Sequence, residues 1–169
     1  MFEVLKKINN VIEYVLLKFL IIIMSILIIS TFLQVFSRYV LKNPFVWTTE
    51  VSTFIFIWMA FMGASVGVKR CEHFVVEIIY NITPQRAHKY ILIFTHLCIL
   101  SVSLILLVSG YKFSLMGLSN VSSTLRISMF YMYCSVFLSG LFMTLFSIEN
   151  IIKIFKKQLT ISDDKVEEV

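Results

Sequence analysis

Four long stretches without a charged residue are the strongest constraint on how this chain can fold. They cover residues 19–37, 51–68, 90–111 and 127–148, and each holds 18 to 22 residues. At a rise of about 1.5 Å per residue, a helix of that length crosses a hydrocarbon core of about 30 Å. The strands of a membrane barrel would alternate polar and apolar residues, and these stretches do not. Because the bilayer interior offers the backbone no hydrogen-bond partners, the sequence predicts four transmembrane helices.

Composition favours the same class of protein. Of the 169 residues, 59% are hydrophobic, and the mean hydropathy is +0.89. A soluble domain needs far less apolar surface, so the surplus is expected to face lipid. We predict an all-α integral membrane protein with one four-helix domain over residues 1–157 and a mobile cytoplasmic tail over residues 158–169. The spans are expected at about residues 15–38, 46–68, 90–111 and 127–149.

The first helix is expected to be longer than the membrane is thick. Its apolar run exceeds the core of a usual signal peptide, and Arg38 and Tyr39 follow it where a cleavage site would need small residues. We therefore interpret it as a retained span. Apolar residues at helical spacing before the run predict a helix from near residue 3 to Val40, about 55 Å long. Such a helix must tilt, bend or protrude.

The distribution of lysine and arginine predicts the orientation. Eleven of the 15 fall on one side of the four spans: Lys6, Lys7, Lys18, Lys69, Arg70, Arg86, Lys89, Lys153, Lys156, Lys157 and Lys165. The other four are Arg38, Lys42, Lys112 and Arg126. Positive loops stay in the cytoplasm, so both ends of the chain are expected there. This topology and attraction to anionic lipid account for the net charge of +5, and no nucleic-acid partner is expected.

The connections between spans have signals of their own. Asn43 followed by Pro44 predicts a helix N-cap with proline at the first helical position, and thus a tight antiparallel hairpin of spans one and two. In the segment 69–89, apolar residues alternate with polar ones at helical spacing, which predicts an amphipathic helix on the cytoplasmic interface. Thr83 followed by Pro84 is expected to end that helix.

Small residues mark two possible helix seams. Gly63 and Gly67 form a GxxxG pattern in span two, with Ala60 and Ala64 on an adjoining stripe. Such residues let helix backbones approach closely, either inside this bundle or against another subunit, and both interpretations stay open. Span four carries a similar stripe, which could bond across helices and supply a second seam: Ser135, Ser139, Gly140 and Thr144.

Glu50 is the acid of most interest, three residues after Trp47 at the outer start of span two. One interpretation is an interfacial tryptophan anchor with a charge that stabilises the helix start. The other is a structural ion pair with Arg38, or a docking contact.

The sequence argues against independent catalysis or transport. It holds no paired metal ligands, nucleophile elbow or phosphate-binding glycine loop, so no enzyme, metal or cofactor is expected. Of three histidines, His73, His88 and His96, only His96 lies within a span, which does not supply the two axial ligands of a haem. No Asp, Glu, Lys or Arg lies inside the uncharged runs, so a charged substrate would have to be bound by a partner.

The region from Ser37 to Pro84 resembles the small membrane subunit of tripartite ATP-independent periplasmic (TRAP) transporters. The resemblance rests on the order and spacing of Arg38, Tyr39, Pro44, Trp47, Glu50, Gly63, Arg70, His73, Glu77 and Pro84. Length and four-helix topology agree over nearly the whole chain. Thr49 departs from the pattern, because relatives often carry a second acid beside Glu50.

The resemblance implies a scaffold in the bacterial inner membrane. A periplasmic binding protein would deliver an organic acid, of the sialic acid or C4-dicarboxylate class, to a large sodium-coupled permease subunit that moves as an elevator. The small subunit would hold that permease through interface or structural residues, for which the candidates are Arg38, Tyr39, Trp47, Glu50, Gly63, Gly67, Arg70, His73 and Glu77. Two rivals remain, a self-sufficient homodimeric four-helix exporter and a membrane anchor for a redox complex.

Overall fold

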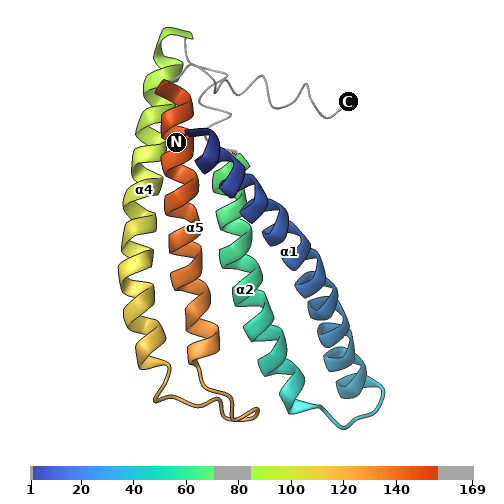
Figure 1. Cartoon of the computed structure of the whole chain (residues 1–169). Coiled ribbons are helices and arrows are strands. Elements are labelled where there is room, and N and C mark those ends of the chain that lie inside the picture. Colours follow the sequence, from blue (N-terminus) through green and yellow to red (C-terminus); the bar gives the residue numbers. More distant parts are fainter. Residues whose placement is uncertain (1, 71–84, 156–169) are drawn as a thin grey trace.

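Four long helices make up the chain in the computed structural model, which describes residues 2–70 and 85–155 (Figure 1). They are α1 (Phe2–Tyr39), α2 (Val46–Arg70), α4 (Gln85–Met116) and α5 (Phe130–Phe155). All four are long and apolar enough to cross a membrane, which confirms the prediction of an all-α protein with four spans. Within one or two residues, α1 also has the predicted bounds.

The helices stand in a row and do not close into a compact bundle. α4 packs along α5, α5 packs on α2, and α2 packs on α1 (Figure 1). At its start, α1 also reaches α5. Two ends of the molecule can be distinguished. The loop end holds residues 40–45 and 117–129, and the terminus end holds the start of α1 and the end of α5.

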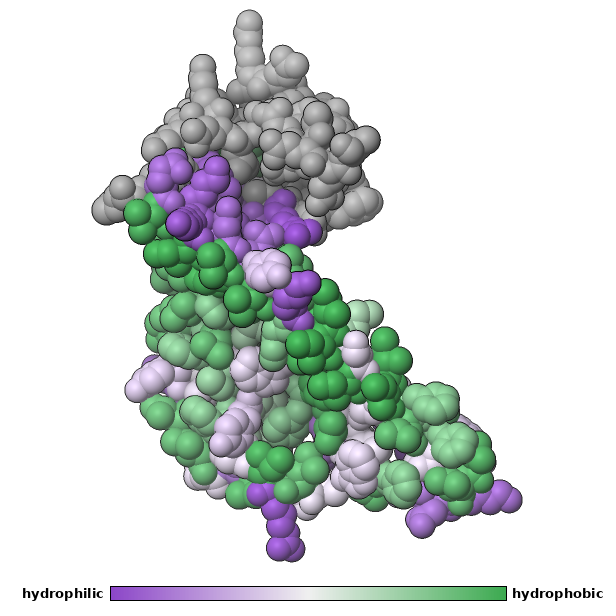
Figure 2. All heavy atoms as spheres, turned by 45° about the vertical axis from the view of Figure 1, so that its right-hand side comes forward, coloured by the Kyte–Doolittle hydropathy of each residue, from purple (hydrophilic) through white to green (hydrophobic). Residues whose placement is uncertain are grey.

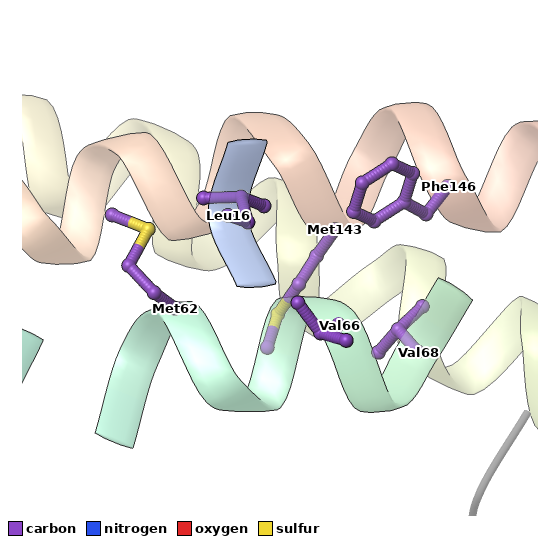
Figure 3. Packing of buried hydrophobic residues seen from close by; sticks show 6 residues of the cluster. All are labelled: Leu16, Met62, Val66, Val68, Met143 and Phe146. Carbon is purple, nitrogen blue, oxygen red and sulfur yellow. The ribbon is translucent and has the colours of Figure 1, made fainter. Parts of the chain in front are cut away.

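A small apolar core lies where α1, α2 and α5 meet, nearer the terminus end. Figure 3 shows its six buried members, which are Leu16 of α1, Met62, Val66 and Val68 of α2, and Met143 and Phe146 of α5. Phe19 and Trp58 extend it toward the loop end with an edge-on ring contact, their centroids 5.8 Å apart. These contacts fix α1 and α5 on α2, and α4 is attached mainly through α5.

The turn between α1 and α2 differs from the prediction. α2 begins at Val46, so Asn43 and Pro44 lie in the connection and do not form its N-cap and first turn. Lys42 reverses the chain with a φ of 53°, and Ser37 Oγ then accepts a hydrogen bond from the backbone N–H of Phe45. These turn contacts take the place of an asparagine cap and delay the helix by two residues.

Several predictions fall on residues outside the described ranges. The amphipathic interfacial helix, His73, Glu77 and Pro84 lie there, and so does the tail 158–169. They remain predictions.

The surface is apolar over most of its height. Figure 2 shows hydrophilic residues gathered at the terminus end beside the start of α1, with a largely hydrophobic surface below them. In the most apolar stretch of each helix, 17% is buried within the structure for α1 and for α4, against 44% for α5. α5 is therefore the central helix, and α1 and α4 offer their faces to lipid or to another protein.

Candidate functional site

A row of small residues runs along the outer side of α2, opposite the side that buries Met62 and Val66. In this row Ala60 and Ala64 are exposed, and Gly63 and Gly67 are half-buried. Among the described residues, a Cβ atom added to Gly63 or to Gly67 would meet no atom within 4 Å. The two glycines therefore do not serve packing between the described helices. We call these four residues the small-residue stripe.

Other glycines do perform close packing inside the chain. A Cβ on Gly140 of α5 would lie 2.6 Å from the backbone nitrogen of Leu107, and one on Gly110 of α4 would lie 2.7 Å from that of Phe137. Only glycine lets the two backbones come so near. Gly110 and Gly140 therefore serve packing between α4 and α5, whereas Gly63 and Gly67 do not serve packing of this kind.

The hydroxyl stripe of α5 is an internal seam. Ser139 donates to the carbonyl of Phe61 on α2 at 2.9 Å, and Thr144 Oγ1 lies 3.0 Å from Ser103 Oγ on α4. These bonds confirm the prediction that the stripe bonds across helices. They place this second seam inside the chain, because Gly140 packs on α4 and Ser135 is buried.

Glu50 anchors the loop between α4 and α5. Its carboxylate accepts hydrogen bonds from the hydroxyls of Ser122 and Ser123, the latter at 2.8 Å. It also accepts from the backbone N–H groups of Thr124 and Leu125, both at 2.9 Å. A loop that turns hydroxyls and amides toward one point forms an anion-binding concavity, and Glu50 fills it.

The predicted ion pair between Arg38 and Glu50 is wrong. No ion pair of the described residues joins them, since the loop occupies both oxygens of the carboxylate. Arg38 and Tyr39 are exposed at the end of α1, and Tyr39 is 73% accessible. Trp47 is 44% accessible and stacks on Phe45 with centroids 6.4 Å apart, as suits an interfacial anchor.

A buried charged cluster ties three helices together at the terminus end. Glu149 of α5 is inaccessible, and its two oxygens lie 2.8 and 2.7 Å from the ammonium of Lys69 on α2. Lys153 adds a second ammonium at 3.0 Å, and the amide of Asn9 on α1 donates to Glu149. Asn150 donates to the carbonyl of Val68 at 2.8 Å. We call Asn9, Lys69, Glu149 and Lys153 the charged cluster.

A second ion pair lies next to this cluster. Arg70 Nε lies 2.8 Å from a carboxylate oxygen of Glu13, and the Arg70 side chain is 39% exposed. Arg70 is thus a structural contact between α1 and α2 at the last residue of α2.

Reasoning from sequence missed the charged cluster. The uncharged run ends at Ile148 and the predicted span at residue 149, so the pattern gives Glu149 no buried partner. The spacing of Glu149 and Lys153, four residues apart on a helix, was the available signal. Trp58 was missed too, although its indole N–H donates to the carbonyl of Tyr131 at 2.9 Å and links α2 to α5. His96, which the sequence places within a span, is buried between the helices and 2% accessible.

Comparison with known proteins identifies the family. The model of the DctQ component of tripartite ATP-independent periplasmic transporters matches residues 27–157, which include α2, α4, α5 and part of α1. More than half of the chain is therefore covered.

Individual relatives carry related names. The C4-dicarboxylate TRAP transporter small permease protein DctQ of Vibrio cholerae is 34% identical over 90 residues, 53% of this chain and 39% of the relative. The sialic acid TRAP transporter small permease protein SiaQ of the same species is 25% identical over 160 residues, 95% of this chain and 91% of the relative. The sialic acid TRAP transporter permease protein SiaT of Haemophilus influenzae is 29% identical over 66 residues, 39% of this chain but only 11% of SiaT.

The family match, the SiaQ alignment along nearly the whole chain and the four apolar helices point the same way. The chain belongs to the DctQ component family of tripartite ATP-independent periplasmic transporters, and it is a multi-pass protein of the bacterial inner membrane and not an enzyme.

Proposed function

We propose that this chain is the small permease subunit of a TRAP-type transporter and acts as a fixed membrane scaffold for a large permease subunit. The observation that carries the proposal is the small-residue stripe, which lies open although its residue types are those of close helix contacts. Helices associate in lipid largely through such close backbone packing. The large subunit is therefore expected to seat one of its helices along α2.

The match to SiaT supports a partner of this kind. A stretch of 66 residues of this chain is similar to 11% of SiaT, which is a longer permease protein. In SiaT, a segment related to this chain is therefore covalently joined to the rest of a permease. A small subunit encoded as a separate chain would instead bind its permease through a non-covalent interface. The stripe on α2 supplies a surface for that contact.

The charged groups inside this chain do not favour an independent substrate path. Glu149 and Lys69 pair with each other, and Glu50 is held by the loop between α4 and α5. A substrate path would need ionisable groups that face an opening. Sodium coupling and the elevator movement are therefore assigned to the large subunit.

The orientation proposed from the sequence places the loop end in the periplasm. Its cations are Arg38, Lys42, Lys112 and Arg126, and Glu50 is the one acid in the same segments of the sequence. A periplasmic binding protein with an acidic face would complement this surface. The substrate class proposed is an organic acid, because SiaQ and DctQ are named for sialic acid and C4-dicarboxylate transporters.

One observation bears on the rival hypothesis of a homodimeric exporter. Such a protein needs a buried acid, and Glu149 is buried. Two lysines and an amide occupy its oxygens, however, which fits a structural group better than a transport site.

Co-purification tests the proposal. The tagged chain would be expressed alone and together with a co-encoded large permease, then isolated in mild detergent. The proposal expects the large permease to elute with the chain in a fixed ratio. Isolation of the chain as a homodimer that leaves the permease behind would favour the exporter.

A further inference from the structure

The start of α1 carries two exposed strips of opposite character. Asn9 and Leu16 face inward and are buried. The apolar strip consists of Val4, Ile8, Val11 and Val15, which are 50 to 61% accessible. With 3.6 residues per turn, the other exposed residues of this segment gather on the adjoining side of the helix. This polar strip holds Glu3, Lys6, Lys7, Asn10, Tyr14 and Lys18.

This part of α1 extends beyond the neighbouring helix. Glu13 pairs with Arg70, the last residue of α2, so residues 2–12 continue past that end toward α5. There Asn9 meets Leu145 and Glu149. The eleven residues form about 16 Å of helix. They lie outside the uncharged run that begins at Phe19.

The two strips match the two sides of a membrane surface. Exposed valine and isoleucine at helical spacing are favoured where acyl chains can cover them, and lysine is favoured beside anionic headgroups. The ammonium of Lys18 lies 5.5 Å from the centre of the Tyr14 ring, and both residue types are common at the boundary between lipid and water. Three lysines against Glu3 give the polar strip an excess of positive charge.

We propose that residues 2–18 of α1 bind an anionic phospholipid surface, with the apolar strip among the acyl chains and the polar strip at the headgroups. Charge complementarity selects lipid as the occupant, since the two strips adjoin along the helix and the cations border the apolar residues. The segment then anchors the terminus end to one leaflet. The proposal concerns the chain itself and does not rest on the large permease.

Site-directed spin labels test the two strips separately. The full chain, with Cys71, Cys98 and Cys134 changed to Ser, would be placed in nanodiscs of phosphatidylcholine with phosphatidylglycerol. Val11→Cys and Asn10→Cys are the matched pair, one from each strip. The Val11 label is expected to collide more with oxygen, which dissolves in lipid, and the Asn10 label more with a water-soluble nickel complex. Equal accessibility to nickel, or protection of both labels from both reagents, would overturn the proposal; the second result would indicate a protein partner.

The charge contribution needs its own comparison. A lysine near an anionic surface changes partitioning by roughly fivefold. Lys6→Gln combined with Lys7→Gln should therefore raise the nickel accessibility of the Val11 label several-fold in anionic nanodiscs and leave it unchanged in phosphatidylcholine alone. Lys112→Gln, at the loop end, is the control and should have no effect. An unchanged Val11 label in the double variant would contradict the role of the anionic headgroups.

Discussion

Two glutamates, one at each end of the molecule, fix neighbouring segments in different ways. Glu149 is fully buried and balances Lys69 and Lys153 where α1, α2 and α5 meet. Glu50 lies at the start of α2 and receives hydrogen bonds from the turn Ser122 to Leu125. Loss of the Glu149 carboxylate should leave the buried ammonium of Lys69 without a counter-charge. Loss of the Glu50 carboxylate should free the loop between α4 and α5.

We expect Glu149→Gln to destabilise the isolated chain strongly. Removing one partner of a buried ion pair costs about 3 to 5 kcal/mol, because the ammonium of Lys69 loses its carboxylate. Combining Glu149→Gln with Lys69→Met should recover most of this loss, since neither buried charge then remains. Thermal unfolding in detergent, followed by tryptophan fluorescence, would measure both effects.

Glu13→Gln is the matched control for this prediction. Its partner Arg70 is partly exposed, and such a pair contributes about 0 to 1 kcal/mol. Equal losses of stability from Glu13→Gln and Glu149→Gln would show that the buried charged cluster contributes no more than a partly exposed ion pair.

We expect Glu50→Gln to loosen the loop between α4 and α5. The amide group would turn an N–H toward donors that now point at a carboxylate, so several of the four contacts would be lost. Faster proteolysis within residues 117–129 would report the change. Arg38→Ala is the control and should leave the loop protected from the protease. If Arg38→Glu restored the protection that Glu50→Arg removes, Arg38 and Glu50 would form an ion pair after all.

The limits of sequence reasoning are clear from these residues. Uncharged runs predicted the spans because their lengths match the bilayer. The partner of Glu50 was missed because it lies more than 70 positions away in an irregular loop, and helix periodicity says nothing about such contacts. Glu149 was overlooked because a boundary charge in sequence can still be buried by a helix that crosses over it, as α1 does at Asn9.

At the scale of the helices, the position of each glycine decides its role. The GxxxG pattern of α2 and the single Gly140 of α5 look alike in sequence as sites of close approach. In the fold, α5 packs on α4 so tightly that Gly140 has no room for a Cβ, whereas Gly67 faces open space. Sequence alone left these alternatives open because it does not say which side of a helix meets its neighbour.

Gly140→Ala and Gly67→Ala should change the stability of the isolated chain in opposite directions. The added methyl group at Gly140 overpacks α4 against α5, which costs about 1 to 3 kcal/mol. At Gly67 nothing obstructs it, and the better helix propensity of alanine should stabilise by up to about 1 kcal/mol. Denaturant or thermal unfolding of the two variants side by side would decide. Destabilisation by Gly67→Ala would mean that α2 is packed differently.

At the scale of the whole molecule, the row of helices leaves large faces that no other described part of the chain covers. A closed bundle would bury the outer side of α2, but here α4 lies beyond α5 and does not cover it (Figure 1). The sequence predicted the number and order of spans. It did not predict the open row, because apolar residues facing lipid and apolar residues facing protein look the same.

The orientation is expected to follow the 11 to 4 distribution of lysine and arginine. Alkaline phosphatase, which is active only in the periplasm, should be active when fused after Asn120 and inactive when fused after Gln158. The reverse pattern would place the loop end in the cytoplasm and remove the argument for contact with a binding protein.

The most direct test of the scaffold role is co-purification of the large permease with Gly63→Leu. Leucine should block the approach of a partner helix to the small-residue stripe, so the permease should be lost while the isolated chain keeps its unfolding temperature. Ser101→Leu, which adds bulk at an exposed position on α4, is the control and should retain the permease. Full retention of the permease by Gly63→Leu, or loss with both variants alike, would contradict docking along α2.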